Sequence, residues 1–148
     1  MAKAQAPSVG YSGTPLLKKL GYTSDQSAAL IDVPKALRPH LASAKFKALS
    51  ETSIDTLARL KAPLDAAHLF ATERAKLKRA LPQLMQRLAP AGMIWVSWPK
   101  KAAKMETDIT EDVIRAEALP LGLVDVKVCA VDETWSGLKL VIRKELRK

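Results

Sequence analysis

The sequence predicts a single α/β domain whose sheet is mainly parallel and ends in an antiparallel strand. Short apolar runs alternate with amphipathic segments along most of the 148 residues. Parallel strands joined by right-handed helical crossovers produce this alternation. Only residues 132–137 separate the last two apolar runs. Because a parallel crossover needs about a dozen residues or more, these two strands must pair antiparallel.

Local signals define the elements of the first half. Residues 1–8 have the composition of a disordered tail, and residues 9–148 form the domain. Thr14 is a suitable N-cap, Pro15 a suitable first helical residue and Gly21 a suitable stop, so these residues predict a short helix. The following elements are a buried strand at 27–33 ended by Pro34, a turn or broken helix at 35–41, an alternating edge strand at 45–49, and a helix at 53–60 with Ile54, Leu57 and Ala58 inward.

The second half begins with an apolar run at 65–71, which predicts a strand. Thr72 is a candidate N-cap for the helix that follows, and leucines recur along it at helical spacing up to Leu88. Pro82 should kink or split this helix near Arg79, and the Pro90–Gly92 group should end it. The remaining elements are a central strand at 93–98, a helix capped by Thr107 or Thr110 that ends before Gly122, and strands at 124–131 and 138–143.

Composition limits the functional classes. The only cysteine is Cys129 and there are two histidines, His40 and His68, so we expect no disulfide and no metal site. No apolar run is long enough to span a membrane or to form a signal peptide, so we expect a cytoplasmic protein without a membrane partner. The net charge of +9 permits nucleic-acid binding, although a solvated basic surface is the more common explanation. We expect no cofactor and no catalytic residue.

Four motifs carry a resemblance. They begin at Gly10 (GYSGTPL), Trp95 (WVSWPKK), Thr107 (TDITED) and Val128 (VCAVDETWSGL). With them the chain resembles a small bacterial family of proteins of unknown function. The strand order also resembles that of S-adenosylmethionine-dependent methyltransferases. The resemblance implies a truncated, Rossmann-like, methyltransferase-like fold and implies no activity.

The chain departs from the methyltransferase pattern after its first strand. Those enzymes have a glycine-rich turn there, so that the backbone closely approaches S-adenosylmethionine. Here the corresponding segment, 32–39, contains Pro34 and Pro39 and no glycine. Glu51 is the nearest candidate for the acidic residue that would hold the ribose. There is also room for only one strand between Val33 and Asp65, so one edge strand of the usual sheet is missing.

Ligands of parallel α/β sheets bind beyond the carboxyl ends of the strands. This rule collects candidate ligand-binding residues from four strand ends: Asp32, Thr72, Trp98, Lys100, Lys101, Asp132 and Trp135. Each also has a structural interpretation. Trp98 would cover the core, Trp135 would anchor a hairpin loop, and the two lysines would be solvated.

Three functions remain open from the sequence. The first is a non-catalytic, methyltransferase-like protein that binds a small molecule or a protein partner at the carboxyl ends of the strands. The second is an atypical S-adenosylmethionine-dependent transferase. The third is a module that binds nucleic acid through its basic surface. The missing glycines argue for the first function over the second, and therefore against an enzyme.

Overall fold

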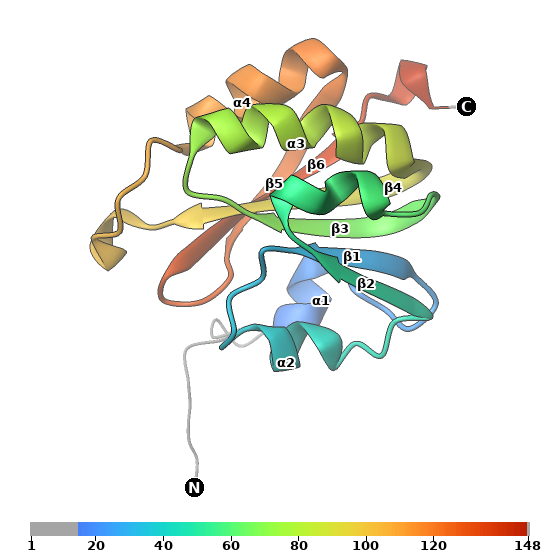
Figure 1. Ribbon diagram of the computed structural model, residues 1–148, viewed down its shortest axis with the longest axis horizontal. Coiled ribbons are helices and arrows are strands. Elements are labelled where there is room, and N and C mark those ends of the chain that lie inside the picture. Colours follow the sequence, from blue (N-terminus) through green and yellow to red (C-terminus); the bar gives the residue numbers. More distant parts are fainter. Residues whose placement is uncertain (1–14, 148) are drawn as a thin grey trace, which may run out of the picture.

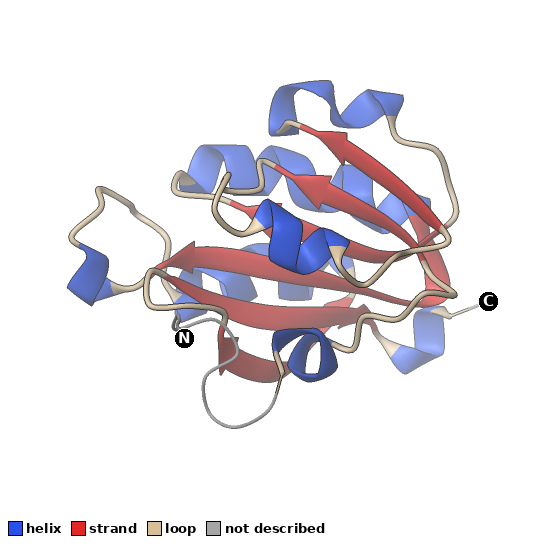
Figure 2. Cartoon of the chain, turned by 90° about the horizontal axis from the view of Figure 1, so that it is seen from below, coloured by secondary structure: helices blue, strands red, loops and turns tan. Residues whose placement is uncertain are grey.

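The computed structural model describes residues 15–147, which form one six-stranded sheet with helices packed against both faces (Figures 1 and 2). The strands are β1 (Ser27–Ile31), β2 (Ala48–Thr52), β3 (Leu64–Phe70), β4 (Leu88–Pro99), β5 (Leu123–Ala130) and β6 (Trp135–Ile142). The helices are α1 (Leu16–Leu20), α2 (Arg38–Ala42), α3 (Arg74–Arg87) and α4 (Glu111–Ala118), with short 3-10 segments η1 (Ile54–Arg59), η2 (Lys101–Ala103), η3 (Leu119–Leu121) and η4 (Lys144–Leu146). The predicted tail and Thr14 lie outside the described residues.

The order of strands across the sheet is β2-β1-β3-β4-β6-β5. The four strands β2, β1, β3 and β4 are parallel to one another, whereas β6 is antiparallel to both β4 and β5. This arrangement confirms the predicted sheet. A single strand, β2, lies between β1 and β3 in sequence, as the chain length between them had indicated.

The central strand β4 shows how the sheet divides the core. Ile94, Val96 and Trp98 belong to the apolar cluster under η1, α3 and α4. Met93 and Trp95 belong to the second cluster, under α1 and α2. Successive side chains of a strand point to opposite faces, so an almost uninterrupted apolar run in β4 serves both clusters.

The edge strand β2 lies three residues later in sequence than predicted, at 48–52 in place of 45–49. Lys45 has a positive φ of 53° and lies in the preceding loop. The Phe46 ring packs edge-on against Tyr22, with 5.4 Å between ring centroids. The alternation of residues 45–49 therefore reflects one aromatic contact in a loop. The neighbouring prediction for Ala58 is also wrong, because its side chain is exposed on η1.

The helix α3 is not split by Pro82 and runs unbroken from Arg74 to Arg87. Leu77, Leu81 and Leu84 are buried along it as predicted. The chain then enters β4 directly at Leu88, so residues 90–92 lie inside a strand and do not end the helix. Here the buried leucine face outweighs the single backbone hydrogen bond that a proline removes.

The C-terminal third follows the predicted order, with strand boundaries that differ from the prediction by one to three residues. Thr110 caps α4, because its hydroxyl accepts a hydrogen bond from the Val113 N–H at 3.2 Å. Gly122 ends the helical segment with a φ of 98°. The strand β6 begins at Trp135, three residues earlier than predicted, so Trp135 is a strand residue and not a loop residue. No helix in residues 15–147 is long and apolar enough to cross a membrane.

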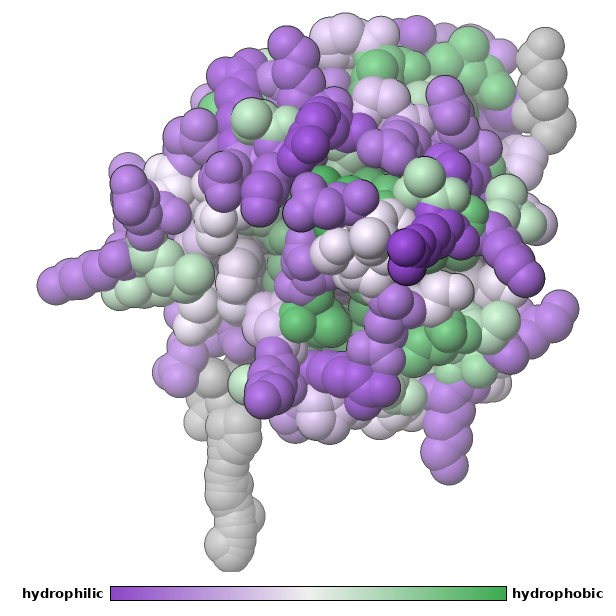
Figure 3. All heavy atoms as spheres, in the orientation of Figure 1, coloured by the Kyte–Doolittle hydropathy of each residue, from purple (hydrophilic) through white to green (hydrophobic). Residues whose placement is uncertain are grey.

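The surface drawn in Figure 3 consists mainly of hydrophilic side chains with smaller hydrophobic areas between them. The two edge strands of the sheet are more exposed to solvent than its central strands. The last edge strand, β5, leaves Val126 and Val128 half-exposed, and β2 is exposed along nearly its whole length.

Candidate functional site at the carboxyl ends of the strands

The parallel strands end at the same edge of the sheet, on the left in Figure 1. We call this edge the rim. The predicted residues Asp32, Thr72, Lys100 and Asp132 each follow a strand that ends there, while Trp98 is the penultimate residue of β4. Trp135 joins them because β6 starts where β4 ends, with Pro99 and Trp135 in register. The prediction of a common edge is therefore confirmed, and the roles of the individual residues depend on their contacts.

Asp32 forms the turn after β1. Its φ of 54° is in the left-handed region, where glycine is the usual residue. Its backbone N–H continues the ladder to the Thr52 carbonyl at 2.9 Å. Its side-chain Oδ2 accepts a hydrogen bond from the Ile54 N–H at 3.1 Å, at the start of η1. The Asp32 carboxylate thus already serves to join β1 to η1.

Glu51, the candidate for holding a ribose, is also engaged. Arg38 of α2 donates from Nε to Oε1 at 2.7 Å and from Nη2 to Oε2 at 2.6 Å. This two-point pairing uses both carboxylate oxygens. The carboxylate raises the pKa of Arg38 through these hydrogen bonds, so the guanidinium stays charged. Both oxygens of the Glu51 carboxylate therefore already accept a hydrogen bond from Arg38.

Thr72 connects β3 to α3 in a different way from the prediction. Its side chain does not cap the helix; Glu73 occupies the cap position without a side-chain hydrogen bond. The first helical N–H, of Arg74, instead donates to Asp108 Oδ1 at 2.7 Å. The Thr72 carbonyl accepts from Thr107 Oγ1 at 2.7 Å. A distant segment therefore caps α3, and local sequence patterns do not reveal such a contact.

A hollow of about 560 Å³ lies at this part of the rim. It is lined by residues where β3 passes into α3 and by residues of the segment before α4: Thr72, Glu73, Ala75, Glu106, Thr107 and Asp108. Three of these six carry carboxylates and none carries a positive charge. The lining of this hollow is therefore polar and acidic.

The two tryptophans at the rim lie on opposite faces of the sheet. Trp98 belongs to the core cluster under α3 and α4, and Trp135 belongs to the cluster under α1 and α2. Trp135 packs edge-on against Phe70, with 5.3 Å between ring centroids. Each tryptophan is 9% exposed. The structure therefore does not bring them into one pocket, because the sheet separates them.

The lysines and Asp132 shape the two loops that leave β4 and β5. Asp132 Oδ1 accepts hydrogen bonds from the N–H groups of Thr134 and Trp135, at 2.8 and 2.7 Å. These contacts tighten the hairpin and start β6 at Trp135. The Lys100 N–H donates to the Thr134 carbonyl at 2.8 Å, so the two loops are joined. Lys101 is exposed, as expected, whereas Lys100 is half-buried.

A buried polar chain lies under α1, and the sequence did not single it out. Tyr22 Oη is 2.9 Å from His68 Nδ1, and His68 Nε2 is 2.7 Å from Ser97 Oγ. The His68 ring stacks on Phe70 at 4.3 Å between centroids. Burial lowers the pKa of His68 to about 3 and raises that of Tyr22 well above its usual value. The sequence signal for this chain was the position of His68 in an almost continuously buried strand, which indicates that the ring is buried but not which residues it contacts.

A Ser–His pair at hydrogen-bond distance also occurs in nucleophilic enzymes. Here His68 and Ser97 are both fully buried. A nucleophile must reach a substrate, and neither side chain of this pair does. The chain Tyr22–His68–Ser97 therefore holds the segment after α1 against the sheet.

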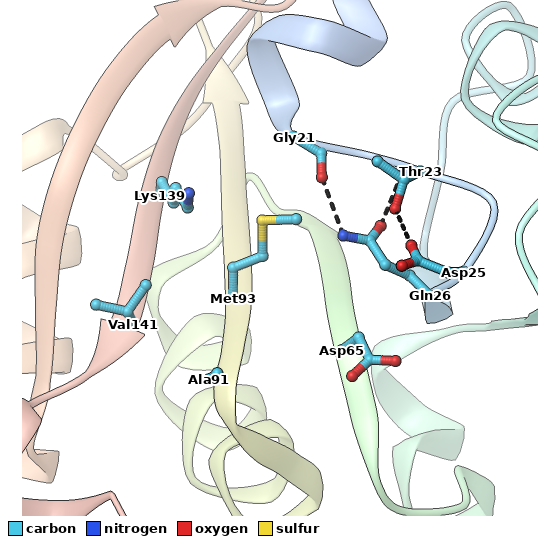
Figure 4. Close-up of a pocket in the computed structure, with 9 residues that line it drawn as sticks. All are labelled: Gly21, Thr23, Asp25, Gln26, Asp65, Ala91, Met93, Lys139 and Val141. Atoms are coloured by element: carbon cyan, nitrogen blue, oxygen red, sulfur yellow. Dashed lines mark hydrogen bonds between the residues drawn. The ribbon is translucent and has the colours of Figure 1, made fainter.

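A second hollow, of about 430 Å³, lies at the opposite end of the strands (Figure 4). Figure 4 shows Met93 between Lys139 and Val141 of β6 and the loop from Thr23 to Gln26. Its polar groups are largely engaged with one another. Gln26 Nε2 donates to the Gly21 carbonyl at 3.0 Å, and a carboxylate at the bottom of the view, Asp65, accepts from the Ser27 N–H at 2.9 Å. These contacts fix the loop between α1 and β1.

Within residues 15–147 no three histidine, cysteine, aspartate or glutamate side chains gather as they would around a metal ion. Cys129 is half-buried, and burial raises the pKa of its thiol despite nearby Lys19 and Lys127. A raised thiol pKa disfavours the nucleophilic thiolate.

The fold is similar to those of solved methyltransferases. A SAM-dependent methyltransferase from Aquifex aeolicus aligns with a TM-score of 0.62 at 12% identity, over 86% of this chain and 88% of that protein. The ribosomal protein L11 methylase from Lactobacillus delbrueckii subsp. bulgaricus aligns with a TM-score of 0.61 at 12% identity, over 80% and 71% of the two chains. The CcbJ methyltransferase from Streptomyces caelestis aligns with a TM-score of 0.61 at 7% identity, over 86% and 88%.

At these identities the likeness shows a methyltransferase-like, Rossmann-like fold and nothing beyond it. A scan against protein-family models finds no match, and a search of curated proteins finds none either. The described residues after β1 do not fit the usual cofactor turn, because they lack glycine and because the Asp32 carboxylate already accepts a hydrogen bond from the Ile54 N–H.

Proposed function

We propose that this chain is a non-catalytic binding protein with a methyltransferase fold, and that it takes a small ligand at the rim. The observation that carries the proposal is the engagement of two carboxylates at the ends of β1 and β2. Asp32 accepts from the Ile54 N–H, and Glu51 is held by Arg38. A cofactor ribose would have to compete with these contacts for the two carboxylates.

The backbone after β1 supports the same conclusion. A glycine-rich turn lets the backbone approach the cofactor closely and offers free N–H donors. Here the Asp32 N–H is used by the Thr52 carbonyl, and Pro34 has no N–H. One backbone donor after β1 is therefore used within the fold, and another is missing.

The proposed ligand site is the hollow beside Thr72. Its carboxylates come from Glu73, Glu106 and Asp108, and Thr72 and Thr107 add polar groups. Asp108 has a structural role, since it caps α3. Glu73 and Glu106 are exposed, and the exposed ion pair of Glu73 with Lys76 is long, at 3.7 Å. We therefore assign the recognition of a cationic ligand to Glu73 and Glu106.

Spermidine serves as a cationic probe for this hollow in a melting-temperature titration. We expect a saturable rise for the wild-type protein and a much smaller one for the double variant Glu73→Gln, Glu106→Gln. A matched control is Asp112→Gln with Glu133→Gln, which removes two exposed carboxylates elsewhere. Equal responses of the two variants would contradict the assignment of the ligand to this hollow.

The alternative function is an atypical S-adenosylmethionine-dependent transferase. The similar solved structures are methyltransferases, and this likeness supports the alternative. In the same titration we expect no shift with S-adenosylmethionine or S-adenosylhomocysteine. A saturable shift with both would favour the transferase over the binding protein.

A further inference from the structure

The edge strand β2 presents an open hydrogen-bonding edge below β1 in Figure 1. The N–H of Ala48 donates toward the Gln26 carbonyl, and the Thr52 carbonyl accepts from the Asp32 N–H. The backbone groups of Ala48 and Thr52 therefore point toward β1. Because alternate residues of a strand point their backbone groups to opposite sides, Leu49 and Glu51 direct theirs outward. The edge offers two donors and two acceptors at strand spacing.

The side chains of β2 leave this edge accessible. Ala48, Leu49, Ser50 and Glu51 are all exposed, and Leu49 is an apolar side chain with 36% of its surface in solvent. The other edge strand, β5, is interrupted by a shift of register between Asp125 and Lys127. Such bulges hinder the addition of a further strand. The ladder of β2 with β1 has no such interruption.

The charges around β2 indicate which kind of partner this edge favours. A hollow of about 540 Å³ beside the strand is lined by Ser50–Thr52, Thr56 and Leu60 together with Arg59 and Lys61. Neither Arg59 nor Lys61 forms an ion pair with a described residue, and Lys45 and Lys47 precede the strand. The acidic Glu51 is neutralised by Arg38. Positive charge therefore predominates along an open edge.

We propose that β2 binds an extended acidic peptide segment of a partner protein, which adds as a further strand to the sheet. Backbone hydrogen bonds to Leu49 and Glu51 would supply the affinity, and Arg59 and Lys61 would select acidic side chains. A second copy of this chain is a poor occupant, because the net charge of +9 makes two copies repel each other.

A single-stranded nucleic acid is disfavoured as the occupant. Base stacking needs exposed aromatic rings. Among the described residues the three tryptophans, Tyr22 and Phe70 are buried, and Phe46 is half-buried against Tyr22. The alternation of donors and acceptors along β2 matches a peptide strand.

The test uses a fluorescein-labelled peptide of about seven residues in which Glu and Val alternate. We expect saturable anisotropy with the wild-type protein. The double variant Arg59→Glu, Lys61→Glu should weaken binding by about tenfold or more, since it reverses two charges at the site. The matched control Arg143→Glu, Lys144→Glu makes the same change of net charge at exposed residues beyond β6 and should bind like the wild type.

Strand addition is tested separately by amide exchange. On binding, the amides of Leu49 and Glu51 should become protected, whereas that of Ser50, which already faces β1, should not change. The same peptide with a central proline should not bind, because proline interrupts the ladder. The proposal fails if the proline peptide binds equally well, if both charge variants bind alike, or if an oligonucleotide of equal charge protects the same amides.

Discussion

At the scale of single residues, His68 is the most informative side chain. It is fully buried and bonded at both ring nitrogens, to Tyr22 and to Ser97. Burial lowers its pKa from 6.5 to about 3. The ring is therefore neutral in the folded protein at any pH where the protein is normally studied.

This neutral ring makes stability depend on pH. Between pH 6.5 and about 3 the unfolded chain binds a proton at His68 and the folded chain does not. The free energy of unfolding should thus fall as the pH is lowered through this window, by up to about 1.4 kcal/mol per pH unit. Urea denaturation at pH 7 and at pH 5 measures this difference.

The variant His68→Gln should lose much of that slope. His40→Gln is the matched control and should keep the wild-type slope, because its ring is exposed in the folded protein. Equal slopes for wild type and His68→Gln would show that another group causes the pH dependence.

At the scale of elements, two glycines end helical segments with a positive φ. Gly21 follows α1 with a φ of 77°, and Gly122 follows η3 with a φ of 98°. A β-carbon added at Gly21 would make an ordinary contact, 3.6 Å from Met93 Cε. A β-carbon added at Gly122 would collide with Leu146 Cδ1. Both positions require a left-handed backbone, but only Gly122 lacks room for a β-carbon.

Gly21→Ala should therefore lower the free energy of unfolding by about 1 kcal/mol, because the left-handed conformation disfavours alanine. Gly122→Ala should lower the free energy of unfolding by more than Gly21→Ala does. In the double variant Gly122→Ala, Leu146→Ala, loss of the Leu146 side chain should restore part of this difference. Urea denaturation of the three variants measures this. Equal losses for the two single alanine variants would show that Leu146 adjusts freely.

At the scale of the whole molecule, the positive charge is spread over many elements and is partly neutralised. On α3, Arg74 pairs with Glu117 at 2.7 Å and Arg79 lies 3.5 Å from Asp55. These pairs reduce the field that a nucleic acid would meet at the surface.

We therefore expect only weak, sequence-independent association with single-stranded DNA. The affinity should fall steeply when salt is raised from about 50 mM to about 200 mM, because only phosphate contacts would hold the complex. Fluorescence anisotropy with two unrelated oligonucleotides measures it. Tight binding of one sequence at the higher salt would revive the nucleic-acid hypothesis.

The order of elements and the direction of every strand could be predicted, because apolar runs and connection lengths are local properties. The edge strand was misplaced by three residues, since the alternation around Phe46 arises from its contact with Tyr22. Pro82 was expected to break α3, but burial of that helix on the sheet is a tertiary effect. The start of β6 was missed because Asp132 closes a tighter turn than its sequence indicates.

The sequence predicts where the candidate site lies, but it does not predict which contacts the residues of the site make. Strand ends bring Asp32, Thr72 and Asp132 to one rim, and the topology rule requires this. The partners of those residues come from distant segments, such as Asp108 on Arg74 and Arg38 on Glu51. A single sequence without such pairings cannot distinguish an available carboxylate from an engaged one.

The central claim is our proposal that this chain has a methyltransferase-like fold and does not bind S-adenosylmethionine at the usual position. Isothermal titration calorimetry of the wild-type protein with S-adenosylmethionine tests it most directly. We predict no saturable heat at ligand concentrations up to about 1 mM, a limit that corresponds to roughly 4 kcal/mol of binding free energy. A saturable isotherm with one site per chain and a dissociation constant in the micromolar range would contradict the account.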